Sequence, residues 1–164
     1  MGHFDDLLAV NESYAASFVD EGMPGQAAKG LAVVTCMDSR IDPLRMLGLR
    51  PGEAKILRNA GGRVTDDVLR TLVLATHLLG VNRVLVVEHT DCKMASATDD
   101  QVHQTIFDSS GIDTRSLVFQ TMDDQLLSLA GDVQRVRSSP YLPAALEVGG
   151  FLYDVHSGRL REVF

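Results

Sequence analysis

Cysteine is scarce and tryptophan is absent in this chain of 164 residues, whose two cysteines are Cys36 and Cys92. Two thiols exclude a four-cysteine zinc site within one subunit. A disulfide between them would fit an exported protein. Both cysteines lie close to charged or imidazole side chains, however, and the first twenty residues mix acidic with apolar residues, unlike a signal peptide. We therefore expect free thiols and a cytoplasmic location.

Basic residues are few as well: 15 Lys and Arg are set against 22 Asp and Glu, giving a formal net charge of -7. Nucleic acids and anionic membrane surfaces bind basic patches, so this balance argues against both as partners. No apolar run approaches the roughly 20 residues that a membrane-spanning helix requires. The composition therefore favours a small-molecule partner.

The length suits one domain that is large enough to bury a core. The contents of 45% hydrophobic and 23% charged residues are ordinary for a globular protein, and the sequence contains no internal repeat. We therefore treat residues 1–164 as a single domain.

Two short, β-branched apolar runs each end in a group of polar residues. Residues 31–34 lead into Cys36-Met37-Asp38-Ser39-Arg40, and residues 84–87 lead into His89-Thr90-Asp91-Cys92. If both runs are buried parallel strands, their carboxyl ends can lie side by side, where open α/β proteins place their sites. Cys36, His89 and Cys92 would then converge. Three protein ligands are typical of catalytic zinc, because they leave a fourth position for water or substrate.

These two motifs resemble those of the β-class carbonic anhydrases, in particular the short, prokaryotic-type members. The family's marks are Cys-x-Asp-x-Arg after the first strand and His-x-x-Cys after a later one, and both are present in that order. The segments 58–61 and 150–155 are also similar to family segments. The resemblance covers nearly the whole chain, from about residue 31 to residue 160.

The resemblance implies a zinc enzyme that reversibly hydrates carbon dioxide to bicarbonate and a proton. By similarity, Cys36, His89 and Cys92 hold one Zn²⁺ per subunit, and Asp38 with Arg40 forms the catalytic dyad. When Asp38 pairs with Arg40, a zinc-bound hydroxide can attack carbon dioxide. When Asp38 turns onto the metal as a fourth ligand, the site is closed. We therefore expect the activity to rise with pH.

The neighbouring residues carry further expectations. Ala60 and Gly61 follow a predicted strand and are candidates for the substrate pocket, since glycine lets the backbone approach a ligand closely. Asp91, between two ligands, is expected to be a hydrogen-bonding loop residue rather than a ligand. Lys93 replaces the glycine usual in the family, which implies a relaxed loop or a positive charge near the site. Without tryptophan, an accessory bicarbonate site is not assumed.

The other histidines match no family ligand position. His77 is expected on a helix face, and the sequence selects none of His3, His103 and His156 as a proton carrier.

Periodicity and capping residues predict the remaining elements. Helices are expected at 4–19, 43–47, 65–79, 98–110 and 121–137, with Asp42, Thr65, Thr98 and Thr121 as N-caps. Strands are expected at 31–36, 54–58, 83–88 and 114–119. A hairpin of residues 148–155 and 160–163 is expected at an edge of the sheet, antiparallel to the rest.

The predicted fold class is therefore α/β: a central, mostly parallel β-sheet with an antiparallel edge strand, flanked by helices. The amphipathic N-terminal helix could pack on its own domain. The family resemblance implies that it packs on a partner subunit instead, in a homodimer or a dimer of dimers, with the pocket at the interface.

Two other functions stay open. An enzyme of the same architecture could hydrolyse carbon disulfide or carbonyl sulfide, linear molecules whose carbon a hydroxide attacks in the same way. A non-catalytic zinc-binding or redox-sensing protein would instead have four protein ligands, or would lose no function on Asp38→Asn. A cysteine phosphatase is excluded, because a phosphate cradle needs more residues between Cys36 and Arg40.

Overall fold

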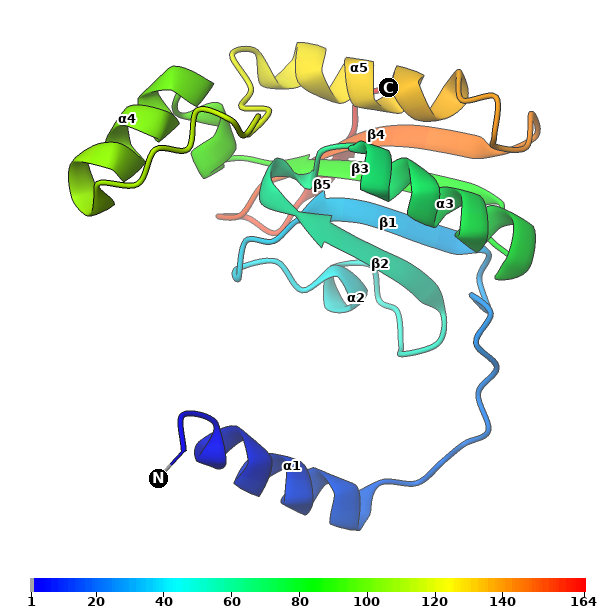
Figure 1. Ribbon diagram of the computed structural model, residues 1–164. Helices are drawn as coiled ribbons and strands as arrows, with labels where there is room; N and C mark the ends of the chain where they lie inside the picture. Colours follow the sequence, from blue (N-terminus) through cyan, green and yellow to red (C-terminus); the bar gives the residue numbers. More distant parts are fainter. Residues whose placement is uncertain (1) are drawn as a thin grey trace.

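Five strands form one sheet in the computed structural model, which describes residues 2–164 (Figure 1). Their order across the sheet is β2-β1-β3-β4-β5. The bounds are β1 (Leu31–Cys36), β2 (Ala54–Asn59), β3 (Arg83–His89), β4 (Glu147–Tyr153) and β5 (Leu160–Glu162). Strands β1 to β4 run parallel to one another, and β5 is antiparallel to β4. The predicted mostly parallel sheet with an antiparallel edge strand is confirmed.

Strand β4 corrects one prediction. Its residues were expected at an antiparallel edge, yet β4 lies inside the sheet and pairs in parallel with β3, with Val84 opposite Val148. The chain runs back from the end of helix α5 (Gln125–Arg137) through residues 138–146, so β4 starts at the same end of the sheet as β3. Only β5 forms the antiparallel edge.

Three of the predicted helices begin at their expected caps. Helix α2 (Pro43–Met46) follows Asp42, whose side chain accepts the amide of Arg45. Helix α3 (Asp66–Leu78) follows Thr65, whose hydroxyl accepts the amide of Val68. Helix α4 (Asp99–Ser110) begins with the predicted capping box of Thr98 and Gln101 and ends at Gly111, whose backbone is left-handed at φ 73°.

The segment before helix α5 differs from prediction. Residues 114–119 do not form a strand, and α5 begins at Gln125 with Asp124 as its N-cap, not at Thr121. The Asp99 carboxylate accepts the backbone amides of Phe119 and Thr121 at 2.8 and 2.9 Å, and also the Thr121 hydroxyl at 2.6 Å. These bonds hold the segment as a loop against α4, because its amides are no longer available to a strand partner.

The core lies on both faces of the sheet. Helices α3 and α5 cover one face, where Leu72 and Leu129 pack with Val34 and Val86. The short helix α2 covers the other face, where Met46 packs near Val33. Two single-turn 3₁₀ helices, η1 (Ala60–Gly62) and η2 (Lys93–Ala95), follow β2 and the loop after β3. Both therefore lie at the carboxyl end of the parallel strands.

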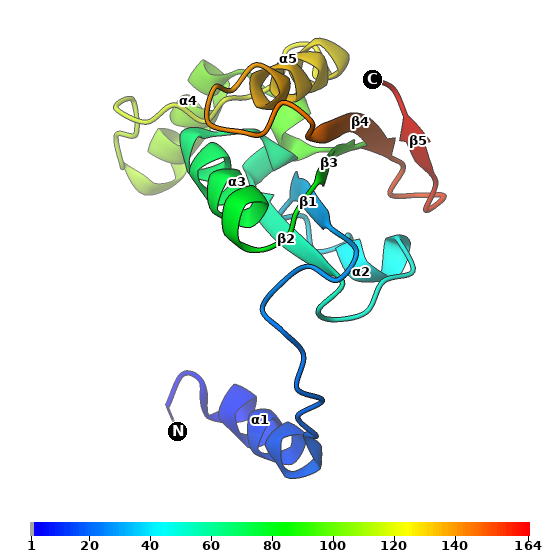
Figure 2. The same ribbon diagram turned by 90° about the vertical axis from the view of Figure 1, so that its right-hand side faces the viewer.

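Helix α1 (Asp5–Ser17) stands apart from the other elements in two perpendicular views (Figures 1 and 2). None of its residues is buried, so the simpler expectation that it packs on its own domain is wrong. Within residues 2–164, no helix is both long enough and apolar enough to cross a membrane.

Candidate metal centre

Two neighbouring parallel strands bring the predicted ligands together. Strand β1 ends at Cys36, strand β3 ends at His89, and Cys92 follows three residues later. The sulfur atoms and the imidazole nitrogen lie within 4.8 Å of one another. All three residues are buried, and among the described residues they are the one group of this kind. The sequence prediction that these side chains converge therefore agrees with the geometry.

The orientation of His89 suits a metal ligand. Its Nδ1 atom lies 2.8 Å from the carbonyl oxygen of Thr90, so this nitrogen carries the proton and donates it. The Nε2 atom is buried and has no hydrogen-bond partner among the described residues. A buried nitrogen without a partner is costly in a protein interior, and a metal ion would accept its lone pair.

The pKa values of the two thiols are shifted in opposite directions. Cys36 and Cys92 are free. A hydrogen bond from the Cys92 thiol lowers the pKa of Cys36 and raises that of Cys92. The Gly61 backbone amide also donates to the Cys36 sulfur at 3.3 Å. A sulfur atom with these donors is stabilised as a thiolate, the form that binds metals. Two cysteines and one neutral histidine fit Zn²⁺ with one coordination position left for a small molecule.

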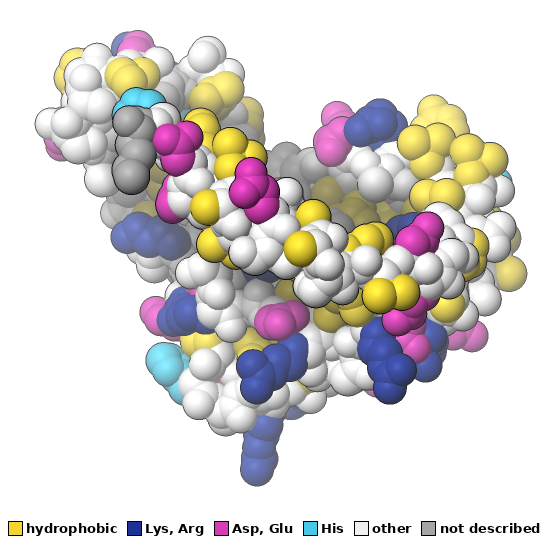
Figure 3. All heavy atoms as spheres, turned by 90° about the horizontal axis from the view of Figure 1, so that it is seen from below, with side chains coloured by type: hydrophobic (Ala, Val, Ile, Leu, Met, Phe, Trp, Pro, Cys, Tyr) yellow, Lys and Arg dark blue, Asp and Glu magenta, His cyan; other side chains and the backbone are white. Residues whose placement is uncertain are grey.

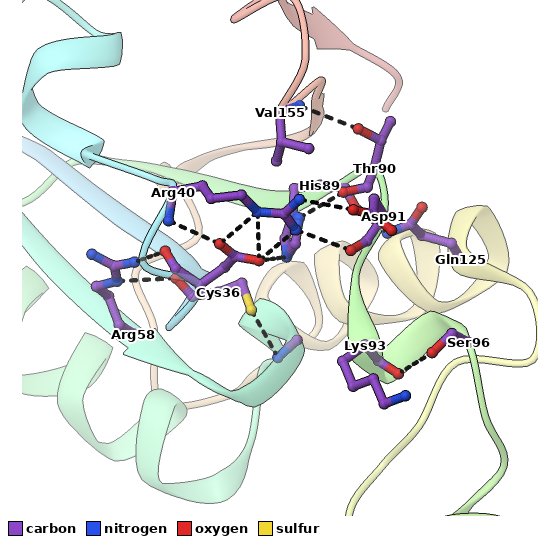
Figure 4. Close-up of polar contacts among 12 residues, drawn as sticks. Cys36, Arg40, Arg58, His89, Thr90, Asp91, Lys93, Ser96, Gln125 and Val155 are labelled. Carbon is purple, nitrogen blue, oxygen red and sulfur yellow. Dashed lines mark hydrogen bonds and ion pairs between the residues drawn. The ribbon is translucent and has the colours of Figure 1, made fainter.

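Asp38 lies beside His89 and is bound by Arg40. The guanidinium of Arg40 lies close to His89 and Asp91 in Figure 4. The Arg40 Nε and Nη2 atoms lie 3.0 and 2.7 Å from the two carboxylate oxygens. These hydrogen bonds hold the pKa of the Asp38 carboxyl well below its usual range. The nearer carboxylate oxygen is 3.9 Å from His89 Nε2. Asp38 is therefore ionised and turned towards Arg40.

Arg40 has a second carboxylate partner that the sequence did not identify. Its Nη1 atom lies 2.7 Å from Asp91 Oδ2, and Nη2 lies 3.1 Å from the Asp91 carbonyl oxygen. The predicted role of Asp91 as a hydrogen-bonding loop residue is confirmed, with a partner 51 positions away. Arg40 therefore joins the loop after β1 to the loop after β3.

Two further side chains hold the backbone of these loops. Arg58 donates to the carbonyl oxygens of Cys36 and Asp38 at 3.0 and 2.6 Å. Gln125, at the start of α5, donates to the carbonyl oxygen of His89 at 2.8 Å. Arg58 lies in the segment 58–61, which is similar to a family segment, but the sequence assigned no role to this residue. No local signal marked Gln125, because its contact depends on how α5 packs.

The glycine pair after β2 lies directly behind the ligands. A Cβ atom on Gly62 would lie 2.9 Å from the backbone nitrogen of Cys36 and 2.9 Å from the carbonyl oxygen of Val87. The Gly61 amide contacts the Cys36 sulfur, and Ala60 lines a cavity of about 490 Å³. The predicted close approach of backbone at this turn is therefore present.

The loop after Cys92 explains how Lys93 is accommodated. Lys93 begins the helical turn η2, and the left-handed backbone angle falls on Asp91, at φ 56°. A glycine is therefore not required at position 93. The Lys93 side chain is exposed, and its carbonyl oxygen accepts the hydroxyl of Ser96 at 2.9 Å.

Comparison with known proteins now identifies the family. The family model described as carbonic anhydrase matches residues 31–126, which include all three candidate ligands. The chain belongs to the β-carbonic anhydrase family. It is similar to the proteins named β-carbonic anhydrase 1 of Mycobacterium tuberculosis and Mycobacterium bovis, with 38% identity over 97% of this chain and 96% of each relative.

Solved structures give the same family. The carbonic anhydrase of Streptococcus mutans superposes with a TM-score of 0.92 at 36% identity, covering 100% of this chain and 99% of that one. The family also includes a more distant branch: a carbon disulfide hydrolase of Acidianus is 32% identical over 98% of this chain and 88% of the relative. The resemblance read from the two motifs is confirmed.

Proposed function

We propose that this protein catalyses the reversible hydration of carbon dioxide to bicarbonate and a proton. The observation that carries the proposal is the convergence of Cys36, His89 and Cys92 beside an ionised Asp38 that Arg40 holds. These three ligands would hold one Zn²⁺ per subunit. When bound, the ion supplies a Lewis acid that makes water nucleophilic near neutral pH.

The surrounding residues orient the reactants. Asp38, as a carboxylate, can accept a hydrogen bond from the attacking water. This bond would orient the lone pair of the water towards carbon dioxide. Arg40 prevents Asp38 from swinging towards the ligand atoms, because both carboxylate oxygens are engaged. We assign Ala60 and Gly61 to the wall of the carbon dioxide site, since Gly61 contacts Cys36 and both residues are small and uncharged.

The test combines metal analysis with stopped-flow hydration of carbon dioxide on the wild type and Asp38→Asn. We expect one zinc per chain in both proteins and a loss of at least about 100-fold in the rate for the variant, the size of effect typical of a lost proton acceptor. Zinc-free protein with full activity would contradict the proposal.

The chain offers a matched control for Asp38→Asn. Asp113 and Arg115 form the same Asp-x-Arg pair, with Nε and Nη2 of Arg115 at 2.9 and 2.6 Å from the two carboxylate oxygens. This pair lies in the loop after α4 rather than beside the candidate ligands. Asp113→Asn should therefore leave the hydration rate unchanged.

The same apparatus separates the other functions. Rates with carbon dioxide, carbonyl sulfide and carbon disulfide should show carbon dioxide as the preferred substrate. A preference for carbon disulfide would assign the chain to the function named for its more distant relatives. Bound zinc with no turnover of any of the three gases would support a non-catalytic role.

We also propose that two copies associate through helix α1, in a homodimer or a dimer of dimers. The support is that α1 buries none of its residues in its own subunit. Hydrophobic and acidic side chains share its outer surface (Figure 3). The exposed apolar residues of this segment are Phe4, Leu7, Leu8, Val10, Tyr14, Phe18 and Val19. A partner surface would remove them from water.

Light scattering tests this association. The full chain should have at least twice the 17.8 kDa mass of one chain. Leu7→Asp combined with Tyr14→Asp should reduce the mass to that of one chain, because both residues lie on one side of the helix. Glu12→Gln is the control. The predicted cytoplasmic location would be tested separately by cell fractionation.

A further inference from the structure

The turn that follows β2 brings a backbone amide to a candidate metal ligand, and the following inference rests on the proposed zinc centre. The Gly61 amide donates to the Cys36 sulfur at 3.3 Å, and both residues are buried. A thiolate that accepts a hydrogen bond gives less negative charge to a metal ion that it binds. Two thiolates together carry as much negative charge as Zn²⁺ carries positive charge. The placement of this amide therefore matters for a metal that activates water.

The residues inside the turn do not fix its shape by themselves. Gly61 and Gly62 both have left-handed backbone angles, with φ of 79° and 70°. Glycine adopts many backbone conformations at little steric cost, so a pair of glycines leaves the chain several alternative paths. Contacts from outside the pair must select the path on which the Gly61 amide points at the sulfur.

The side chain of Asn59 closes the turn around the two glycines. Its Oδ1 atom accepts the Arg63 amide at 2.8 Å, and its Nδ2 atom donates to the Arg63 carbonyl oxygen at 2.7 Å. One side chain therefore binds both backbone polar groups of the residue four positions later. Asn59 and Arg63 are partly buried, so water competes less for these bonds than at an exposed turn.

Both ends of this turn are attached to fixed parts of the fold. Asn59 lies opposite Cys36 in the parallel ladder of β1 and β2, and its carbonyl oxygen accepts the Met37 amide at 2.8 Å. At the other end, Arg63 Nε lies 2.7 Å from Asp132 Oδ2 on α5. The bonds between Asn59 and Arg63 therefore hold the turn at a defined distance from the Cys36 backbone.

We propose that Asn59 is a positioning residue of the metal centre. Its side chain sets the backbone of residues 59–63, so that the Gly61 amide keeps its hydrogen bond to the Cys36 sulfur while this sulfur holds a metal ion. Within residues 2–164 the Asn59 side chain forms hydrogen bonds to Arg63 alone. It therefore acts on Cys36 through the backbone of the turn, and it limits the charge that this ligand gives to the metal.

The first test detects the hydrogen bond itself and needs no turnover. In protein loaded with ¹¹³Cd²⁺ in place of Zn²⁺, nuclear magnetic resonance should show a scalar coupling from the metal, through the Cys36 sulfur, to the Gly61 amide proton. Asn59→Ala removes both bonds to Arg63 and should abolish this coupling, while the couplings to the β-protons of Cys36 and Cys92 remain. No coupling to Gly61 in the wild type, or an unchanged coupling in Asn59→Ala, would overturn the proposal.

The matched control is Thr65→Ala. Thr65 is the N-cap of α3, and its hydroxyl accepts the Val68 amide at 3.3 Å. Its removal weakens the chain just after the turn without removing either bond of Asn59. Thr65→Ala should therefore keep the coupling to Gly61.

Asn59→Asp is a second, more conservative variant. It keeps the size of the side chain and the acceptor for the Arg63 amide, but it loses the donor to the Arg63 carbonyl oxygen. It should therefore fold and show a weaker coupling to the Gly61 amide proton than the wild type. A coupling of wild-type size in Asn59→Asp would also overturn the proposal.

The second test measures carbon dioxide hydration with saturating zinc. Asn59→Ala should lower kcat by about tenfold, an effect typical of a lost contact to a metal ligand, and should leave KM unchanged. Thr65→Ala should behave as the wild type. A raised KM with unchanged kcat would show that Asn59 shapes the wall of the carbon dioxide site instead of acting through Cys36, which would overturn the proposal.

The outcomes also separate this inference from the proposed function. If the wild type hydrates carbon dioxide, and Asn59→Ala keeps both the coupling and the kcat of the wild type, the inference is wrong and the function stands. If the coupling is present in the wild type and lost in Asn59→Ala, but the wild type hydrates no carbon dioxide, the proposed function is wrong and the role of Asn59 at the metal centre stands.

Discussion

Arg40 and Asp91 join the two loops that carry the candidate metal ligands. Arg40 Nη1 lies 2.7 Å from Asp91 Oδ2, while Nε and Nη2 of the same guanidinium bind Asp38. One planar group therefore fixes two carboxylates at once. A point charge of the same sign could not reproduce this arrangement, because it lacks the forked donors of arginine.

Arg40→Lys tests this geometry while keeping the charge. We expect the carbon dioxide hydration rate to fall by at least about tenfold, because one ammonium cannot engage both carboxylates and leaves Asp38 free to move. Arg115→Lys, in the pair with Asp113, should leave the rate unchanged. Equal rates for Arg40→Lys and the wild type would show that only the charge at position 40 matters.

Gly62→Ala should destabilise the protein through backbone contacts. The position has a left-handed φ of 70°, and an added Cβ would lie 2.9 Å from both Cys36 N and Val87 O. We expect a loss of about 3 kcal/mol in the free energy of unfolding, the sum of the backbone and packing costs. Urea unfolding at a fixed protein concentration measures it.

Gly48→Ala separates the two costs. Gly48 also has a left-handed φ, of 65°, but an added Cβ would meet nothing within 4 Å. Its substitution should cost only about 1 kcal/mol, from the backbone conformation alone. If both variants lost the same free energy of unfolding, the close backbone contacts at Gly62 would not contribute to the cost of its substitution.

Local signals predicted most of the elements and the convergence of Cys36, His89 and Cys92. The caps at Asp42, Thr65 and Thr98 act within one helical turn, so sequence alone reveals them. Strands β1 and β3 are recognised from buried β-branched runs, and the polar residues that follow them lie at one end of the sheet. The placement of β4 failed, because it depends on where the chain crosses the sheet after α5.

Contacts between residues far apart in the sequence could not be predicted from local sequence patterns either. Asp99 binds a segment that starts 20 residues later, and so turns a predicted strand into a loop. Arg63 pairs with Asp132 across 69 positions. Near this pair, burial and the charge of Asp132 raise the pKa of Glu88 to about 8, so this carboxyl is mostly protonated at pH 7. No periodicity in the sequence indicates such a buried cluster.

The pair of Arg63 and Asp132 should matter for stability because both side chains are shielded from water. Their Nε and Oδ2 atoms lie 2.7 Å apart, with 16% and 6% of the side chains exposed. Asp132→Asn leaves the Arg63 charge without its partner and should cost about 3 kcal/mol in unfolding free energy. Thermal or urea unfolding measures this loss.

An exposed pair supplies the comparison. Arg70 and Asp67 lie 2.8 Å apart, but 67% and 76% of their side chains are exposed. Asp67→Asn should change the unfolding free energy by less than about 1 kcal/mol, because water screens this pair. A similar loss for Asp132→Asn and Asp67→Asn would show that burial does not strengthen the first pair.

Asp99 should give a stability contribution with a defined pH range. Hydrogen bonds from Thr121, and then from the neighbouring amides, lower the pKa of Asp99 to about 2. In the unfolded chain an aspartate titrates near pH 4, at about 3.9. The depressed value means that folding favours the carboxylate, so the stabilisation is complete above the unfolded pKa and is lost as the pH falls towards 2.

Asp99→Asn should therefore lower the unfolding free energy by about 1 to 2 kcal/mol, and this difference should be constant from pH 8 to 5. It should shrink below pH 4, as the unfolded wild type takes up a proton that the folded state resists. Asp100→Asn, in the same helical turn, should cost less than about 0.5 kcal/mol. Urea unfolding of the three proteins between pH 3 and 8 measures both effects. A difference that already fades between pH 8 and 5 would mean that the stabilisation does not come from the Asp99 carboxylate.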